Sequence, residues 1–155
     1  MDSHIIRKAR MNDVRAIHTL LLNAAEDGLL LPRPLRQLYS HLRDFYVVDP
    51  NDGSPIIGCC ALAIIWEGAG EIRSLVVDAA ARGKGFGKLL TETCIEEARD
   101  LGLGRVFSLT YQVGFFESLG FIEVTKEALP QKVWSDCINC PRFPDCDEHA
   151  MLLAL

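Results

Sequence analysis

The spacing of apolar residues changes several times along the chain, and each change marks an expected element. Apolar residues three and four positions apart predict helices, whereas alternating or continuous apolar runs predict strands. Helical spacing follows Asn12, surrounds Leu38 and begins again at Phe86, and a fourth, short helix is expected over 111–119. Strands are expected over 4–9, 45–48, 55–66, 71–78, 105–109, 120–124 and 150–155.

The order of these elements, βααβββαβαβ followed by a tail and a last strand, predicts an α/β fold. We expect a mixed central sheet of six to seven strands flanked by about four helices. The Asn51-Asp52-Gly53 turn joins an early antiparallel hairpin. The long helix after residue 86 is expected to form a parallel crossover, because parallel neighbours need a connection of about a dozen residues or more.

Composition excludes several classes of protein. The chain has 155 residues, a net charge of -5 and 49% hydrophobic residues, which fits one soluble globular domain. No apolar run reaches the roughly 20 residues of a membrane span, and the mixed, charged first ten residues do not resemble a signal peptide. We therefore expect a cytoplasmic protein that binds neither membranes nor nucleic acid. Three cysteines lie in apolar or helical patterns and are expected to be buried thiols: Cys59, Cys60 and Cys94.

A glycine-rich turn joins the strand over 71–78 to the long helix, and it reads Arg82-Gly83-Lys84-Gly85-Phe86-Gly87-Lys88. Amides at a helix start have no intrahelical partner, glycine lets an anion approach them, and the flanking cations add charge. This pattern predicts a phosphate or pyrophosphate site. It fits neither the P-loop nor the dinucleotide motif, since Leu89 and Lys88 occupy required positions. The alternative is an ordinary helix start with glycines for tight packing.

The same residues resemble the R/Q-x-x-G-x-G/A signature of the GNAT superfamily of acyl-CoA-dependent N-acetyltransferases. The strand over 72–78 and Phe115-Phe116-Glu117-Ser118-Leu119-Gly120-Phe121 resemble its flanking patterns, so the likeness covers residues 4 to about 125. It implies an acyl-CoA-binding core over 1–125 and a Cys-rich tail with a final strand over 126–155, in one domain. It also implies acetyl-CoA as cosubstrate, the Val76 amide as oxyanion donor, and contacts from Leu75, Val76, Val77, Arg82, Gly83, Lys84, Gly85, Phe86, Gly87, Lys88 and Phe116.

Amine acetylation needs a base, and Glu71 resembles the strand-borne glutamate that performs this role in the family. Many members carry a tyrosine acid where this chain has Phe116, so Tyr111 is the substitute candidate. Their alternative roles are a solvated carboxylate and a half-buried aromatic. No cysteine lies on the expected cofactor strand, which indicates direct attack of the amine without an acyl-enzyme.

Four further segments carry a narrower resemblance: residues 28–33, residues 45–48 with 57–62, residues 107–110 and residues 129–132. They resemble the acetyltransferase domain of N-acetylglutamate synthase in a short, freestanding form. The resemblance implies an amino acid as acceptor, above all L-glutamate, and a role in arginine biosynthesis. Two carboxylates call for cations, and Arg33, Arg73 and Lys132 are the candidates, although each is also an ordinary surface charge. The alternatives are another amine (a polyamine, an antibiotic or a protein N-terminus) or a non-catalytic acyl-CoA sensor. A homodimer is compatible with the fold.

The tail has the pattern C-x2-C-x5-C-x2-H, formed by Cys137, Cys140, Cys146 and His149. Two close pairs of such ligands suit tetrahedral zinc, but the middle gap is shorter than the usual spacing. A thiol-rich cap over the acceptor pocket, a regulatory disulfide and a zinc-dependent interaction module are the alternatives. The sequence leaves these possibilities open.

Overall fold

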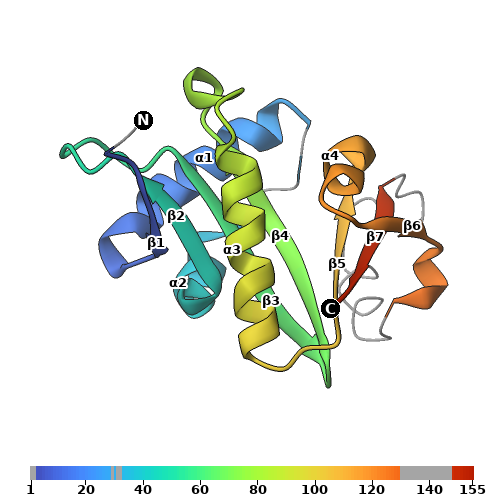
Figure 1. Ribbon diagram of the computed structural model, residues 1–155. Helices are drawn as coiled ribbons and strands as arrows, with labels where there is room; N and C mark the ends of the chain where they lie inside the picture. The colour runs from blue at the N-terminus through green and yellow to red at the C-terminus, as the bar shows by residue number, and fades with distance from the viewer. Residues whose placement is uncertain (1–2, 29, 31–32, 130–147) are drawn as a thin grey trace. The chain divides into compact units, whose positions relative to one another are not determined.

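The computed structural model describes residues 3–28, 30, 33–129 and 148–155. Among these residues lie seven strands and four α-helices, together with short 3-10 turns. In chain order they are β1 Ile5–Lys8, α1 Val14–Glu26, α2 Leu35–Ser40, β2 Phe45–Asp49, β3 Gly58–Trp66, β4 Ala69–Val77, α3 Phe86–Asp100, β5 Arg105–Thr110, α4 Val113–Ser118, β6 Ile122–Val124 and β7 His149–Ala154 (Figure 1).

The strands form one mixed sheet in the order β1-β2-β3-β4-β5-β7-β6. β1 and β3 both pair antiparallel with β2, and β7 pairs antiparallel with β5 and β6. β4 and β5 are parallel, and α3 is the connection between them. The predicted fold class, element order and crossover are therefore confirmed. β3 begins at Gly58 rather than at Pro55, because the segment before it belongs to the loop after β2.

The chain divides into two compact units, Met1–Leu62 with Ser74–Glu96 and Ala63–Arg73 with Glu97–Leu155. The first unit has a core on one face of its strands. There the apolar stripe of α1 and Leu38 of α2 pack against alternate residues of β2 and β3. The fully buried members include Val14, Ile17, Leu21, Leu38, Phe45, Val47, Cys59 and Ala61.

Helix α3 covers the opposite face of the strands of this unit. Successive side chains of a strand point to opposite faces, so Val48 and Cys60 point away from α1. The Cys60 and Cys94 sulfur atoms lie 3.7 Å apart, which places α3 over β3. Gly58 is needed here, because a Cβ atom would lie 3.2 Å from the Val76 carbonyl and 3.4 Å from Leu90. The expected burial of all three thiols is confirmed.

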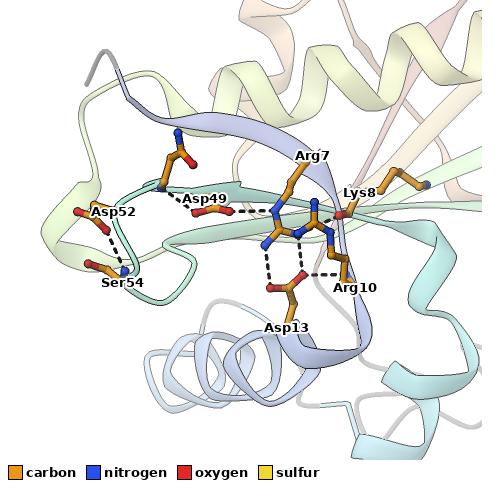
Figure 2. A network of polar contacts seen from close by, with 8 residues as sticks. Arg7, Lys8, Arg10, Asp13, Asp49, Asp52 and Ser54 are labelled. Carbon is orange, nitrogen blue, oxygen red and sulfur yellow. Dashed lines mark hydrogen bonds and ion pairs between the residues drawn. The ribbon is translucent and has the colours of Figure 1, made fainter.

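An ion-pair network fixes the start of α1 (Figure 2). Arg7 donates from Nη1 and Nη2 to Asp13 at 2.7 and 3.0 Å, and from Nε to Asp49 at 3.0 Å. The Arg10 N–H also donates to Asp13, at 2.7 Å. Burial opposes ionisation of Asp13, yet these hydrogen bonds lower its pKa below the usual value. Asp13 is the residue before α1, and its carboxylate accepts from the Arg10 N–H at the start of the 3-10 turn Met11–Asp13 rather than from an amide of the helix.

The second unit has its own apolar cluster. Ala63 and Ile65 of β3 pack with Phe107 of β5, Leu129 and Ala150. β7 lies between β5 and β6 and pairs antiparallel with both, so the last strand of the sequence joins β6 to this part of the sheet. Within the described part of the chain, no helix combines the length and the apolar character needed to cross a membrane.

Candidate functional site

The turn between β4 and α3 presents unpaired amides at the start of a long helix. After β4 the chain makes a 3-10 turn, Ala79–Ala81, and then passes through Gly83 and Gly85 to Phe86, the first residue of α3. The Leu89 N–H donates to the Gly85 carbonyl at 3.1 Å. The amides of residues 85–88 precede this bond and have no acceptor one turn back in the helix.

The two glycines of this turn are not there for packing. Gly83 and Gly85 have φ values of +79° and +85°, a region that residues with a Cβ atom rarely adopt. A Cβ atom at either position would meet nothing within 4 Å. The tight-packing alternative therefore does not explain them. A left-handed backbone beside open space lets a ligand approach the main chain.

The rest of the turn is held in place and carries positive charge. Phe86 is buried, with its ring centroid 5.0 Å from that of His4. Arg82 donates from Nε to the Val77 carbonyl at 3.2 Å, which ties the turn to the end of β4. The side chains of Lys84 and Lys88 are exposed. These charges and the helix dipole favour an anion at this position.

A backbone hydrogen bond at the end of β4 shows which of its amides face β3 and which face away from it. The Asp78 N–H donates to the Ile57 carbonyl at 2.8 Å, so Asp78 faces the side of β3. Alternation along the strand gives the Val76 N–H the same side as that of Asp78 and leaves Leu75 and Val77 with amides on the opposite edge. The role of Val76 as oxyanion donor stays a prediction.

That edge of β4 is only partly paired with β5. The ladder between the two strands covers Ala69–Glu71 on β4 and Arg105–Phe107 on β5. Leu75 and Val77 lie beyond its end along β4. The N–H and C=O groups of these two residues on that edge therefore lie beyond the last paired residues of β4 and β5. The Arg82 side chain donates to the Val77 carbonyl.

Glu71 and Arg73 lie on the same side of β4. Arg73 Nη1 donates to Glu71 Oε1 at 3.3 Å, and the Glu71 side chain is 12% exposed. Arg73 Nε is a buried nitrogen with no acceptor among the described residues. A buried donor without a partner costs about 1–3 kcal/mol, and more for a charged group, so an incoming acceptor group would be favoured here.

Arg33 comes to β4 from the loop between α1 and α2. Its Nη1 donates to Ser74 Oγ at 3.3 Å, and its guanidinium carbon lies 5.7 Å from the centroid of the Phe45 ring. Ser74 itself has a φ of +57°, which is unusual inside a strand. Ser74 could not be identified from the sequence, because serine gives no signal for a left-handed backbone. Lys132 lies outside the described residues.

The aromatic candidates lie in the second unit. Tyr111 is 36% exposed, just before α4. Phe116 is 3% exposed and packs edge-on against Phe115 and Phe121, with centroids 5.1 and 5.0 Å away. This packing accounts for Phe116 and does not support its contact with a cofactor, which stays a prediction.

The metal prediction concerns residues that the structure mostly does not describe. Cys137, Cys140 and Cys146 lie outside the described residues. His149 Nδ1 lies 2.5 Å from Glu123 Oε2. Within residues 3–28, 30, 33–129 and 148–155, no group of three or more His, Cys, Asp or Glu side chains is arranged to hold a metal ion.

Residues 12–121 match the model of the acetyltransferase (GNAT) family. The chain belongs to this family. The predicted resemblance and fold are confirmed, and the chain is an acetyl-CoA-dependent N-acetyltransferase.

The relatives of this GNAT chain fall into two groups by length. It is 41% identical to an uncharacterized N-acetyltransferase, CT2212, of Chlorobaculum tepidum, with 97% of this chain and 96% of the relative covered. It is 36% identical to the amino-acid acetyltransferase of Mycobacterium tuberculosis, over 85% and 76%. A longer amino-acid acetyltransferase from Neisseria meningitidis is 34% identical, and the match covers 81% of this chain but 29% of that protein.

Two solved structures are similar over nearly the whole chain. Rv2747 from Mycobacterium tuberculosis, in complex with CoA, has a TM-score of 0.83 and 33% identity, covering 97% of this chain and 99% of that one. N-acetylglutamate synthase from Neisseria gonorrhoeae, complexed with coenzyme A and N-acetyl-glutamate, has a TM-score of 0.88 and 30% identity, covering 98% and 35%. The GNAT chain thus spans about a third of the length of that synthase.

Proposed function

We propose that this N-acetyltransferase transfers the acetyl group of acetyl-CoA to the α-amino group of L-glutamate, as an entry to arginine synthesis. The choice of acceptor rests on two guanidinium groups at neighbouring positions of β4. One is the side chain of Arg73, and the other comes from Arg33 and contacts the next residue of the strand, Ser74. Arg33 is hydrogen-bonded to Ser74, and Arg73 precedes Ser74 in the chain, with no acceptor for its Nε among the residues that the structure describes. A dicarboxylate acceptor offers one anionic group to each, and guanidinium groups bind carboxylates well. Relatives named amino-acid acetyltransferase and N-acetylglutamate synthase agree with an amino acid as acceptor.

The turn before α3 supports the binding of the cosubstrate. Its residues fit a pyrophosphate, because the amides of residues 85–88 are available and the space beside the glycines is open. We assign phosphate contacts to the backbone and side chains of Arg82, Gly83, Lys84, Gly85, Phe86, Gly87 and Lys88. The pantetheine arm would then pair with the outward edge of β4 at Leu75 and Val77, one of whose amides would face the thioester carbonyl.

In the proposed mechanism, Glu71 accepts a proton from the ammonium group of the acceptor, directly or through one water. The neutral amine attacks the thioester carbon, and an outward amide of β4 stabilises the oxyanion. The attack forms the C–N bond, and collapse of the tetrahedral intermediate breaks the bond to sulfur while Tyr111 gives the departing thiolate its proton. The second proton of the attacking nitrogen then passes through water to the tyrosinate, which leaves a neutral amide and a free thiol. Direct attack fits the buried thiols of Cys59 and Cys60, because Cys59 is buried with its pKa raised to about 12 and the Cys94 hydrogen bond and burial raise that of Cys60.

Product analysis tests this proposal. The purified protein is incubated with acetyl-CoA and, separately, with each of the twenty amino acids, a polyamine and a peptide with a free N-terminus, and products are identified by mass spectrometry. We expect N-acetylglutamate as the main product, and a large rise in the KM for glutamate in Arg33→Ala and Arg73→Ala. Arg36→Ala, at an exposed position of α2, is the matched control. Preference for an acceptor without a carboxylate would refute the assignment. CoA binding without transfer to any amine would indicate a sensor instead.

A further inference from the structure

We propose that Ser74 is a positioning residue for the acceptor, because it holds the Arg33 guanidinium at the left-handed kink of β4. The inference rests on the proposed function, since it assigns Arg33 to an acceptor carboxylate. It adds a residue that does not itself touch the substrate.

The hydroxyl of Ser74 and the ring of Phe45 both contact the guanidinium group of Arg33. Nη1 donates to Ser74 Oγ at 3.3 Å, while the guanidinium carbon lies over the Phe45 ring at 5.7 Å. Phe45 is fully buried and belongs to the core below α1 and α2, so its ring offers a fixed surface. A hydroxyl at one nitrogen and a ring below the plane together restrict a side chain that otherwise has many rotamers.

The backbone of Ser74 is itself held in the unusual conformation that presents this hydroxyl. Its φ of +57° lies in the left-handed region, where a residue with a Cβ atom is strained by about 1–2 kcal/mol. The Cys59 thiol donates to the Ser74 carbonyl at 3.4 Å. Because burial keeps this thiol protonated, it remains a donor at neutral pH.

The kink lies inside β4, between Arg73 and Leu75. Ser74 contacts Arg33 in the loop between α1 and α2, and Val76 joins the core of the first unit. Residues two positions apart share a face of a strand, so Ser74 and Val76 lie on the same side of β4.

Kinetics of two Ser74 variants test the proposal. Ser74→Ala removes the hydroxyl alone, and Ser74→Gly removes it while relieving the backbone strain, so a fold defect cannot explain a shared effect. We expect the KM for L-glutamate to rise about five- to tenfold in both variants, the scale of one lost hydrogen bond. We expect kcat and the KM for acetyl-CoA to change less than about twofold, because the chemistry and the turn before α3 are untouched.

A control variant and a double-mutant cycle test whether the Ser74 substitutions raise the KM for glutamate through Arg33. Asn51 also has a positive φ, +61°, and lies in an exposed loop, so Asn51→Gly eases the backbone equally without touching Arg33. It should leave the KM for glutamate unchanged. In an Arg33→Ala background, Ser74→Ala should cause no further rise, since the two residues act as a unit.

The possible outcomes distinguish the role of Ser74 from the proposed function. If wild-type protein acetylates glutamate and Arg33→Ala impairs it, but Ser74→Ala does not, the role of Ser74 is overturned and the proposed function stands. An additive effect of the two substitutions overturns it as well. If wild-type protein does not acetylate glutamate, the proposed function fails first. In that case NMR still tests the contact between Arg33 and Ser74. The Nε–Hε signal of Arg33, assigned with the Arg33→Lys variant, should shift or broaden in Ser74→Ala, and an unchanged signal would overturn the contact.

Discussion

Replacing Gly85 by alanine should separate the stability of the turn before α3 from its ability to bind coenzyme A. Gly85 has a φ of +85°, and a Cβ atom there would meet nothing within 4 Å. The cost to folding is therefore backbone strain alone, about 1–2 kcal/mol. For a domain of this size that corresponds to a fall in Tm of about 2–8 °C.

The loss of coenzyme A affinity should be larger than this strain predicts. In the bound state the new methyl group would occupy the space through which the pyrophosphate reaches the amides of residues 85–88. Hydrogen bonds to a charged group are worth about 1.5–3 kcal/mol each, so losing one weakens binding about 10- to 150-fold. Isothermal titration calorimetry with coenzyme A measures the affinity, and thermal unfolding without ligand measures the stability.

Gly53 provides a matched control for this experiment. It has a φ of +87° and equally open surroundings, but it lies in the loop between β2 and β3. Gly53→Ala and Gly85→Ala should lose similar stability, while Gly53→Ala binds coenzyme A as the wild type does. Equal affinity in the two variants would show that the open space beside Gly85 is not where the pyrophosphate binds, and the reasoning for the whole turn would be refuted.

Four further substitutions test other parts of the structure. Arg7→Ala leaves Asp13 buried without its main partner and should lower the free energy of unfolding in urea by about 3 kcal/mol, whereas a loss below 1 kcal/mol would contradict the network. Because the pKa of Asp13 is lowered in the folded state, its stabilisation is complete above its unfolded pKa of about 3.9 and is lost as pH falls through the folded value. The difference in unfolding free energy between wild type and Asp13→Asn should therefore shrink below about pH 4, and a constant difference would refute this. Glu71→Gln should lower kcat about 10²- to 10⁴-fold and remove the acid limb of the pH–rate profile. An unchanged kcat and profile would show that another group is the base. Tyr111→Phe should lower kcat about tenfold with little change in either KM; an unchanged kcat would return this tyrosine to a structural role.

The sequence was informative where one physical requirement governs a long stretch of chain. The helical spacing of Val14, Ile17 and Leu21 predicts one buried face, and these residues form the core below the strands. The turn at residues 82–88 was equally readable, because a left-handed backbone and an open helix start need glycine at fixed positions. The match of residues 12–121 to the GNAT family agrees with both.

Local capping and backbone direction could not be taken from the sequence. Asn12 and Asp13 are both residue types favoured at helix starts, and only the position of Arg7 on β1 shows that the Asp13 carboxylate is used in an ion pair. Likewise, which amides of β4 face β3 depends on strand register, so the donor role could not be separated among Leu75, Val76 and Val77.

The sequence by itself determined the order of elements, the glycine-rich turn before α3 and the family, because periodicity and glycine placement are local constraints on the chain. The tertiary structure alone decided how side chains distant in the sequence are used: that Arg7 stabilises the start of α1, that Phe116 is taken up by packing, and that Arg33 meets β4 at a kinked serine. The polar contacts of Arg7 and Arg33 join residues 6 to 42 positions apart, and their geometry depends on strand register and helix placement that no local pattern encodes.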